Sequence, residues 1–422
     1  MGKIYTSVDI GTYSIKFIVG EIIDDKVYVL ASHCIPSKGI KKGLIIEPDL
    51  VKNAIKDGIN EVNDMLGICV KKVIVSIPDY NSKFTPVTGS VTINERVTSS
   101  DVTRVVKDSV YNRLEDGYEL VTVLDIDYKV DGTQEISKPV GKNGQKLDFT
   151  GIMVSTPKKN IYSVLNVMEA SGLEVVDITI SGIADYFEVR NNDIDNKVGA
   201  VINLGHEKTT INVYDHGTLI NNDVLQIGGI NVEKDIAYVF GVSIFDGRTL
   251  KEKFASSHKR YCQISDTWDV KNTIGEVIKL NQLEVSEVVM SRMSEILNLC
   301  KRQIRSLIDQ DIGYIILTGG LTEIKSFKNL AYDIFGKDVI VYSVTTLGIR
   351  DNKYCSAIGM IKYFSNKMDV RGKNFSMFSD EEELMLVSSN NKNKKDNVII
   401  NKLFSNFITG KEDKWWVIME VC

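Results

Sequence analysis

The sequence predicts an α/β protein with a duplicated core, a small α+β module inserted into the first copy and an amphipathic helix near the end. Three observations support this prediction. Strand-length apolar segments alternate with segments of helical period over residues 4–77, and the same order returns from residue 198. Two glycine-centred turns, Asp9-Ile10-Gly11 and Asn203-Leu204-Gly205, open these stretches 194 positions apart. Residues 84–157 interrupt the rhythm with β-rich segments around one helix at about 100–114.

The first copy begins with strand, turn and strand, followed by a third strand, a helix and a fourth strand. Residues 4–21 alternate apolar and polar side chains around the turn at Gly11, and 26–32 continue the pattern. A helix is expected over 49–66, because a proline precedes its apolar period and a glycine follows it. Residues 72–77 form a short apolar strand.

Beyond the inserted module the strands and helices resume and then give way to a polar segment. The predicted elements are a helix over 160–171, a strand over 175–180, a helix that continues through Tyr186, strands over 200–203, 209–214 and 218–224, helices over 231–240 and 280–309, and a strand over 314–317. Residues 365–396 hold an acidic run and a polar run without a sustained period, so we expect a flexible linker there.

The composition excludes several classes of protein. With 422 residues, two to three domains are expected. The net charge of −5, from 51 basic and 56 acidic side chains, argues against a nucleic-acid partner. The six cysteines are scattered, which disfavours a disulfide framework or a zinc site and favours a reducing cytoplasm. No stretch has the length of a transmembrane helix, and no signal peptide precedes the first strand.

The first hairpin has the residues of a phosphate site. Gly11 lets a phosphate approach the backbone, and Thr12 and Ser14 add hydroxyl groups. Asp9 can hold the water shell of Mg²⁺, and Lys16 can meet phosphate oxygens. The alternative is an ordinary hairpin with a polar tip.

The second hairpin repeats this design with changes, and a Gly-Gly turn forms a third element. Asn203 stands where a second acidic residue would face the metal, and His206-Glu207 replace glycines that such a loop prefers. A plain hairpin remains the alternative reading of this loop. Gly319-Gly320 follow an apolar strand and leave room for a flat base or a ribose against bare backbone.

In this order and spacing, the three elements resemble the phosphate-1, phosphate-2 and adenosine motifs of the actin, heat-shock-chaperone and sugar-kinase superfamily. Within it, the chain resembles the FtsA family of actin-like bacterial cell-division proteins, almost continuously over residues 4–364. Further matching stretches are residues 39–43, 73–78, 155–159, 227–229, 235–237, 347–349 and 356–359.

The resemblance implies an actin-like two-lobed fold built from duplicated ribonuclease-H-like domains. By position, the first lobe core (1A) is residues 1–83 and 158–196, subdomain 1C is 84–157, the second lobe core (2A) is 197–226 and 310–364, subdomain 2B is 227–309, the linker is 365–396 and a membrane-targeting tail is 397–422.

The resemblance also implies that ATP and Mg²⁺ are held between the lobes, with Asp9 holding the metal through water. The implied ATP/Mg-binding residues are Asp9, Gly11, Thr12, Ser14, Lys16, Asn203, Gly205, Thr209, Thr210, Lys251, Gly319, Gly320 and Leu321. The Glu/Lys pair that the family places beside the adenine falls on Arg248 and Lys251, so only its lysine matches. Because the amide of Asn203 is no general base, we expect nucleotide binding with slow hydrolysis at most, and no catalytic residue is assigned.

The function implied by the resemblance is a scaffold at the division septum. Such a protein polymerises with itself on the cytoplasmic face of the membrane, tethers FtsZ filaments to it and recruits later division proteins through residues 84–157. Two alternatives remain: a sugar kinase of the same superfamily, which needs an aspartate base beside a sugar pocket, and an actin-like adaptor of pilus assembly, which should lack the terminal amphipathic helix.

The long helix near residues 283–308 has one apolar face and several basic side chains away from it. In FtsA-like proteins this region receives the C-terminal peptide of FtsZ, and an acidic peptide suits the basic residues, which are Arg292, Lys301, Arg302 and Arg305. The alternative is that they complement the dipole at the end of the helix.

The segment over residues 397–410 has helical amphipathic spacing behind the expected linker. Its apolar face consists of Ile399, Ile400, Leu403, Phe404, Phe407 and Ile408. A helix of this kind with no core to pack on reads as an anchor in the membrane interface, and docking back on the body is the alternative. The sequence offers no account of residues 411–422.

Overall fold

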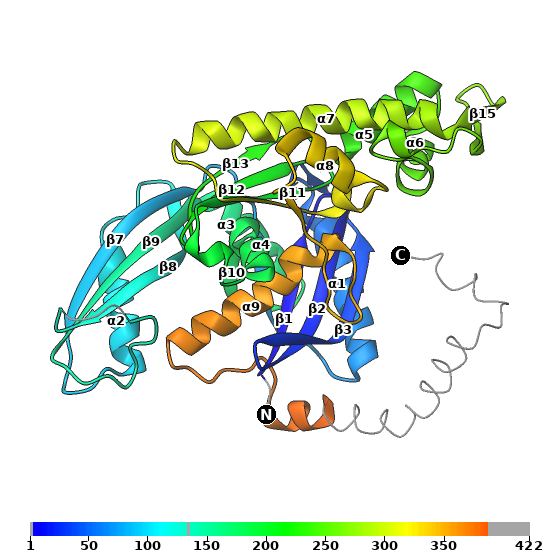
Figure 1. Ribbon diagram of the computed structural model, residues 1–422. Coiled ribbons are helices and arrows are strands. Elements are labelled where there is room, and N and C mark those ends of the chain that lie inside the picture. Colours follow the sequence, from blue (N-terminus) through cyan, green and yellow to red (C-terminus); the bar gives the residue numbers. More distant parts are fainter. Residues whose placement is uncertain (1–2, 133–135, 387–422) are drawn as a thin grey trace, which may run out of the picture.

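Two five-stranded sheets form the cores of two lobes in the computed structural model, which describes residues 3–132 and 136–386 (Figure 1). The first sheet has the order β10-β6-β1-β2-β3, with β1 (Lys3–Ile10), β2 (Ser14–Ile23), β3 (Lys26–Pro36), β6 (Lys72–Ile77) and β10 (Glu174–Ile180). The second has the order β13-β12-β11-β16-β17, with β11 (Gly199–Leu204), β12 (Thr209–Asp215), β13 (Thr218–Leu225), β16 (Tyr314–Thr318) and β17 (Ile340–Val341).

The two sheets share one topology, which confirms the predicted duplication. In each sheet, three consecutive strands pair antiparallel, and the first of them pairs on its other side with a parallel strand. A second parallel strand then extends each sheet, β10 beside β6 and β17 beside β16. Each antiparallel unit therefore places one glycine turn at the same end of its sheet.

Helices cover the outer faces of the sheets, and two helices lie between the lobes. The helices are α1 (Pro48–Leu66), α3 (Lys158–Ala170), α4 (Ser181–Val189), α5 (Gly229–Phe240), α6 (Ile244–Thr249), α7 (Gln282–Leu307), α8 (Phe327–Phe335) and α9 (Cys355–Val370). In Figure 1, α4 and α9 lie between the two sheets and α7 runs along the outer face of the second sheet. Gly359 lets α4 and α9 cross closely, because a Cβ there would lie 1.8 Å from the carbonyl oxygen of Ala184.

The inserted module is a three-stranded antiparallel sheet with one helix and its own apolar core. Its elements are β7 (Lys83–Thr92), α2 (Ser99–Val110), β8 (Tyr118–Val130) and β9 (Lys146–Pro157), with β9 in the centre. Thr98 and Asp101 form a capping box that begins α2. The helix ends at Val110 instead of the expected Leu114, because Tyr111 already has an extended backbone.

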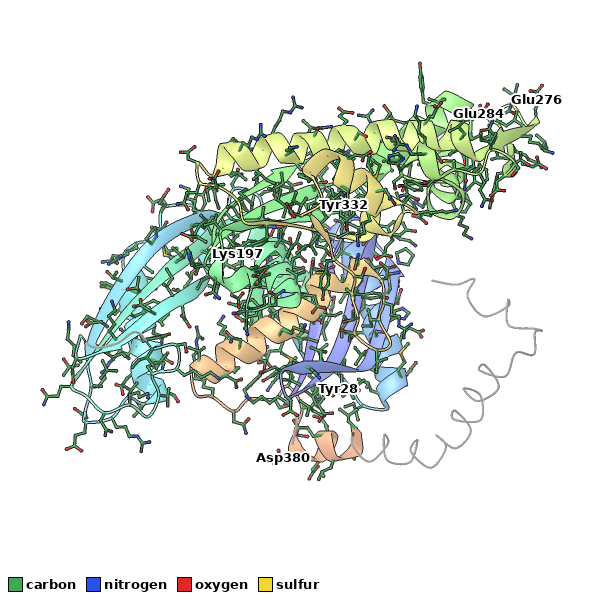
Figure 2. The ribbon with its side chains drawn as sticks, viewed as in Figure 1. Tyr28, Lys197, Glu276, Glu284, Tyr332 and Asp380 are labelled. Carbon is green, nitrogen blue, oxygen red and sulfur yellow. The ribbon has the colours of Figure 1, made fainter. Side chains whose placement is uncertain are left out.

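The far end of the second lobe is built from short elements around the start of α7. They are the hairpin β14 (Thr267–Lys271) and β15 (Val277–Asn281), together with α5 and α6. Asn281 and Glu284 cap α7 reciprocally, and Figure 2 shows Glu276 and Glu284 at this end of the lobe. The remaining short elements are β4 (Ile40–Lys41), β5 (Leu44–Ile45), one π-helical turn (Leu250–Phe254) and 3-10 turns at Ile194–Asn196, Lys259–Tyr261, Gly320–Glu323 and Asn352–Tyr354.

The expectation of a flexible linker from residue 365 is wrong for residues 365–386. Helix α9 continues to Val370, and the chain then packs on β1, where Met377 donates its backbone N–H to the Ile4 carbonyl at 3.2 Å. Phe378 and Leu386 are buried against the first core. Their irregular spacing hid this packing, because apolar residues that cover the end of a central strand need no period. The rest of the expected linker and the tail lie outside the described residues.

Over the described residues, the longest helices are all too polar or too short to cross a membrane.

Candidate functional site

The first glycine turn lies beside a buried ion pair. Asp9 and Lys16 are register partners on β1 and β2, and the Lys16 Nζ lies 2.8 Å from the Asp9 Oδ2. Ser76 on β6 donates its hydroxyl to the other carboxylate oxygen of Asp9 at 3.0 Å. A Cβ on Gly11 would lie 2.8 Å from both the Lys16 Nζ and the Ser14 carbonyl oxygen. The backbone of this turn therefore lies beside a carboxylate and an ammonium group, which the neighbouring strands hold in place.

The second glycine turn repeats the geometry of the first, but the paired strand positions beside it carry no charge. Gly205 donates its N–H to the Lys208 carbonyl at 3.0 Å, as Gly11 does to Ser14 at 3.2 Å. The register partner of Asn203 is Thr210, so an amide and a hydroxyl replace the carboxylate and ammonium of the first hairpin. The duplication thus extends to the turns but not to their ionic chemistry.

The Gly-Gly turn after β16 lies against the second hairpin. Gly319 has a φ of +96°, and a Cβ there would lie 2.5 Å from the Asn203 Oδ1. Gly320 faces open space, since a Cβ there would meet no atom within 4 Å. Leu321 is buried near Gly229. The structure therefore brings the third predicted element to the second, and a flat group has room beside Gly320.

A buried carboxylate that the sequence reading missed joins Arg248 and Lys251. Glu233 on α5 has no exposed side-chain surface and lies 2.9 Å from an Arg248 nitrogen and 2.7 Å from the Lys251 Nζ. Burial alone would raise the pKa of Glu233, but its bonds to these two cations hold that pKa below the ordinary value. In the sequence, the only indication of this site was one acidic residue within the helix predicted over 231–240.

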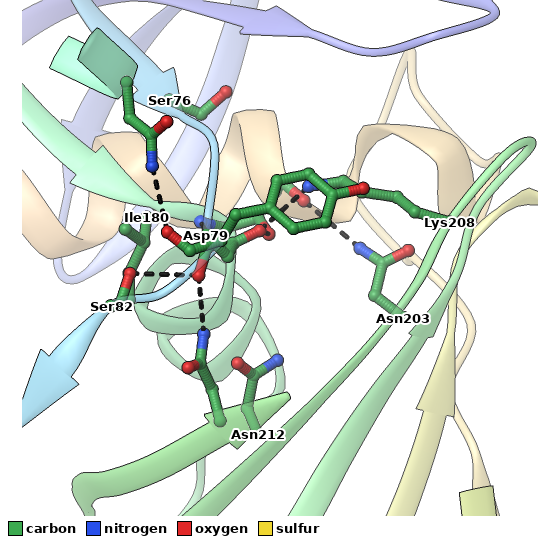
Figure 3. A network of polar contacts seen from close by, with 12 residues as sticks. Ser76, Asp79, Ser82, Ile180, Asn203, Lys208 and Asn212 are labelled. Carbon is green, nitrogen blue, oxygen red and sulfur yellow. Dashed lines mark hydrogen bonds and ion pairs between the residues drawn. The ribbon is translucent and has the colours of Figure 1, made fainter. Parts of the chain in front are cut away.

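The tip of the second hairpin reaches the first lobe with three consecutive side chains. The ring of His206 lies 5.2 Å from that of Tyr13, and Glu207 accepts the Lys42 backbone N–H at 2.5 Å. Lys208 lies 2.9 Å from the Oδ2 of buried Asp79, as Figure 3 shows. Protein contacts therefore bridge the two lobes at the place where the resemblance implies phosphates.

Asp79 is a further site residue that sequence reasoning missed. It follows β6 and accepts both the backbone N–H and the hydroxyl of Ser181 at 2.8 and 2.6 Å. Burial alone would lower the pKa of Lys208, but the ion pair with Asp79 raises it. The position after a buried strand was its signal, since strand ends meet at one edge of the sheet.

Asp185 on α4 is fully buried behind the second hairpin. Its Oδ2 accepts the Asn203 Nδ2 at 2.8 Å, and its Oδ1 accepts the Ser356 hydroxyl from α9 at 2.5 Å. Burial raises the pKa of Asp185 to about 7. As predicted, the strand position at Asn203 has no carboxylate. However, the carboxylate of Asp185 lies next to it, on α4.

The four basic residues predicted on one face of α7 do not lie together. Arg292 binds Asp235 of α5 through two nitrogens, at 2.5 and 3.1 Å, whereas Lys301 donates to the Ile334 carbonyl of α8. Nine residues turn an α-helix by about 180°, which places these two side chains on opposite faces. Arg302 and Arg305 are exposed. The expected shared basic face is therefore wrong.

A shallow groove between α5 and α7 lies beside Arg292. In addition to this arginine, it is lined by three acidic side chains, one serine and three largely apolar side chains, namely Asp235, Glu287, Glu295, Ser291, Tyr238, Val239 and Val288. Tyr238 is 90% exposed and Val239 is 56% exposed. The groove offers exposed apolar surface and one guanidinium that is partly neutralised by Asp235 and Glu295.

Two family models match this chain. The model described as "Cell division protein FtsA" matches residues 200–359, and the model described as "SHS2 domain inserted in FTSA" matches residues 81–155. The curated cell division protein FtsA of Bacillus subtilis (strain 168) is 27% identical over 392 residues, which are 92% of this chain and 89% of that protein. The second model confirms that the α+β module is an insertion.

Solved structures share the fold at low sequence identity. The PilM–PilN type IV pilus biogenesis complex matches with a TM-score of 0.57 and 13% identity, over 86% of this chain and 98% of that chain. The MreB5 of Spiroplasma citri bound to ADP matches with a TM-score of 0.54 and 13% identity, over 88% and 99%. These matches confirm the predicted actin-like two-lobed fold.

Proposed function

This chain belongs to the FtsA family of cell division proteins, and from that premise we propose that it binds ATP between its lobes, assembles with itself, and tethers FtsZ filaments to the cytoplasmic face of the membrane. The observation that supports nucleotide binding best is the pair of matching glycine turns, with buried Asp9 and Lys16 beside the first of them.

The residues around the two glycine turns fit a magnesium triphosphate. A Cβ would fill the space at Gly11 and Gly205, so both turns can bring backbone close to phosphate oxygens. In this proposal Asp9 holds Mg²⁺ through water, and Lys16 turns from Asp9 to the phosphates. The metal would draw negative charge away from the phosphates. Among the described residues, no group of three or more His, Cys, Asp and Glu could hold a metal ion by itself.

Base and ribose are proposed to lie against Gly320, with Lys251 beside them. Glu233 binds Lys251 and Arg248 and offsets their charge. In this proposal it supplies the negative charge that the family's glutamate would supply at position 248. The guanidinium carbon of Arg248 lies 4.4 Å from the ring centre of Tyr13, which belongs to the first lobe. In this proposal the contact opens when the nucleotide enters. The neutral Asn203–Thr210 pair supports slow hydrolysis at most.

The proposed FtsZ contact is the groove between α5 and α7. Arg292→Glu should weaken binding of an acidic FtsZ C-terminal peptide by about 1–3 kcal/mol, the range for one charge-assisted hydrogen bond lost or reversed. Isothermal calorimetry on the full chain measures this change. Arg305→Glu is the matched control, because it reverses one exposed charge elsewhere on α7. Equal loss in both variants would move the contact away from the groove.

The proposed membrane anchor lies at residues 397–410, outside the described residues. Six apolar side chains on one helical face can each contribute about 1–3 kcal/mol on full burial, so partial immersion gives reversible attachment. Phe404→Glu should release the protein from anionic vesicles in a pelleting assay, whereas Ser405→Glu on the predicted polar face should not. Truncation before residue 397 should also abolish pelleting and leave ATP binding intact. Pelleting by the truncated chain would contradict the anchor.

A sugar kinase and a pilus-assembly adaptor remain the alternatives. The likeness to the pilus complex at 13% identity concerns the fold alone. Coupled turnover with a panel of sugars tests the kinase, and vesicle pelleting with and without ATP tests the scaffold. Sugar-dependent ADP release by the wild-type chain would replace the proposed function.

A further inference from the structure

The two glycine hairpins differ in where their negative charge comes from. In the first, the carboxylate of Asp9 sits at the end of β1 and pairs with Lys16 on the neighbouring strand. In the second, the equivalent strand position is Asn203, whose partner across the ladder is uncharged Thr210. The duplicated fold therefore carries an acid and an ammonium group on the paired strands of one hairpin, and an amide and a hydroxyl at the equivalent positions of the other.

A carboxylate nevertheless lies directly behind the neutral hairpin. Asp185 reaches it from α4, and both of its oxygens are used: one accepts the Asn203 amide at 2.8 Å and the other accepts Ser356 at 2.5 Å. Asp185 has no exposed surface. Within the described residues, no lysine, arginine or histidine lies within ion-pair distance of Asp185. A buried carboxylate that has hydrogen bonds but no cation lowers the stability of the fold. Packing between two helices does not require such a carboxylate.

The hydrogen bond from Asn203 also fixes which end of its amide faces the site. Because the Nδ2 group points to Asp185, the Oδ1 acceptor points toward the Gly319 turn, where a Cβ would lie 2.5 Å from it. The oxygen is therefore directed to one of the three elements of the proposed nucleotide site. An amide held in this way offers an acceptor with a carboxylate charge directly behind it.

We propose that Asp185 is a positioning residue that supplies, from the helix between the lobes, the carboxylate that the second hairpin lacks on its own strand. Through Asn203 it directs an oxygen acceptor and a negative charge toward the cation of a bound magnesium triphosphate. This inference rests on the proposed nucleotide function and deepens it. It also changes the expectation for Asn203→Asp, because a second carboxylate 2.8 Å from Asp185 leaves two like charges that cannot both ionise.

An exchange of the two side chains tests the proposal. The full-length wild type, Asp185→Asn, Asn203→Asp and the double exchange Asp185→Asn/Asn203→Asp are compared for affinity toward a fluorescent ATP analogue, with Mg²⁺ and with EDTA, and for Tm. Mg²⁺ should increase the affinity of wild type for the analogue, relative to EDTA. We expect this increase to be at least tenfold smaller in Asp185→Asn. We expect Asn203→Asp to lower both Tm and affinity, and the double exchange to recover the Mg²⁺ effect to within about threefold of wild type.

The control is Asp195→Asn, which removes a carboxylate that binds Tyr186 and Arg190 away from the hairpins. It should keep the wild-type Mg²⁺ effect whatever it does to Tm. An unchanged Mg²⁺ effect in Asp185→Asn overturns the inference, and so does a double exchange as impaired as the single variants. If Asp185→Asn does not fold, the double exchange decides alone, since it keeps one acid and one amide. Wild-type protein that binds no nucleotide overturns the proposed function itself.

Discussion

Gly359→Ala is expected to destabilise the protein more than any other single methyl group added at a glycine in the described residues. The added Cβ would lie 1.8 Å from the carbonyl oxygen of Ala184 and 2.6 Å from its carbonyl carbon, the closest approach to backbone among the described glycines. Both atoms belong to helix backbone, so α4 and α9 must separate instead of a side chain turning aside. We expect the free energy of unfolding to fall by about 3–5 kcal/mol, measured by chemical denaturation.

The effect should extend to the second hairpin, because Asp185 of α4 and Ser356 of α9 bind each other next to Asn203. Gly320→Ala is the control for stability, since its Cβ meets no atom within 4 Å and its backbone needs no glycine. It should change the free energy of unfolding by no more than about 0.5 kcal/mol. Equal stability of Gly359→Ala and wild type would mean that the two helices do not cross as closely as described.

The duplicated core was predictable because its signals are local. A glycine turn between alternating strands needs only about ten residues to be recognised, and both turns proved to have the same hydrogen bond, Gly11 to Ser14 and Gly205 to Lys208. The inserted module was also predictable, because residues 84–157 change the period of the apolar side chains. Helix ends were less well defined, as the early end of α2 at Val110 shows.

The acids around the two glycine hairpins were missed, because the groups that they bind lie on other strands and helices. Asp185 and Glu233 look like ordinary polar residues of helices in sequence, and the packing of α4 and α5 places them beside the second hairpin. Asp79 had a signal in its position directly after β6, but its partners Ser181 and Lys208 are 102 and 129 residues away.

For the basic residues of α7 the error was the reverse: they were predicted to lie together and do not. Arg292 and Lys301 share a helix and a charge, but their partners are on α5 and α8. Composition along one helix does not decide which side chains share a face with a neighbour.

The packing of residues 365–386 was hidden for a different reason. Phe375, Met377 and Phe378 pack near the start of β1, the central strand of the first sheet, without a regular period. Periodicity detects an element that packs along its whole length, whereas residues 371–379 form neither helix nor strand and pack at a few points only. The acidic run that follows, which begins at Asp380, further gave it the composition of a linker.

Gly11→Val is expected to abolish nucleotide binding while the fold persists. A Cβ at this position would lie 2.8 Å from the Ser14 carbonyl oxygen and 2.8 Å from the Lys16 Nζ, so valine must open the turn and push the ammonium away from Asp9. The backbone would then be too far from a phosphate, and the charge that should meet it would be displaced. We expect the Kd for a fluorescent ATP analogue to rise at least 100-fold, which corresponds to about 2.7 kcal/mol.

Two companion variants separate the causes of that loss. Lys16→Met keeps the glycine turn and removes only the ammonium, so it should bind more weakly than wild type but more tightly than Gly11→Val. Gly11→Ala has the smallest side chain that reaches the Ser14 carbonyl, and it should fall between wild type and valine. Circular dichroism and Tm show whether each variant is folded, since the turn lies at the end of a hairpin whose strands are otherwise fully paired. A folded Gly11→Val protein with wild-type affinity would place the triphosphate elsewhere and remove the first hairpin from the site.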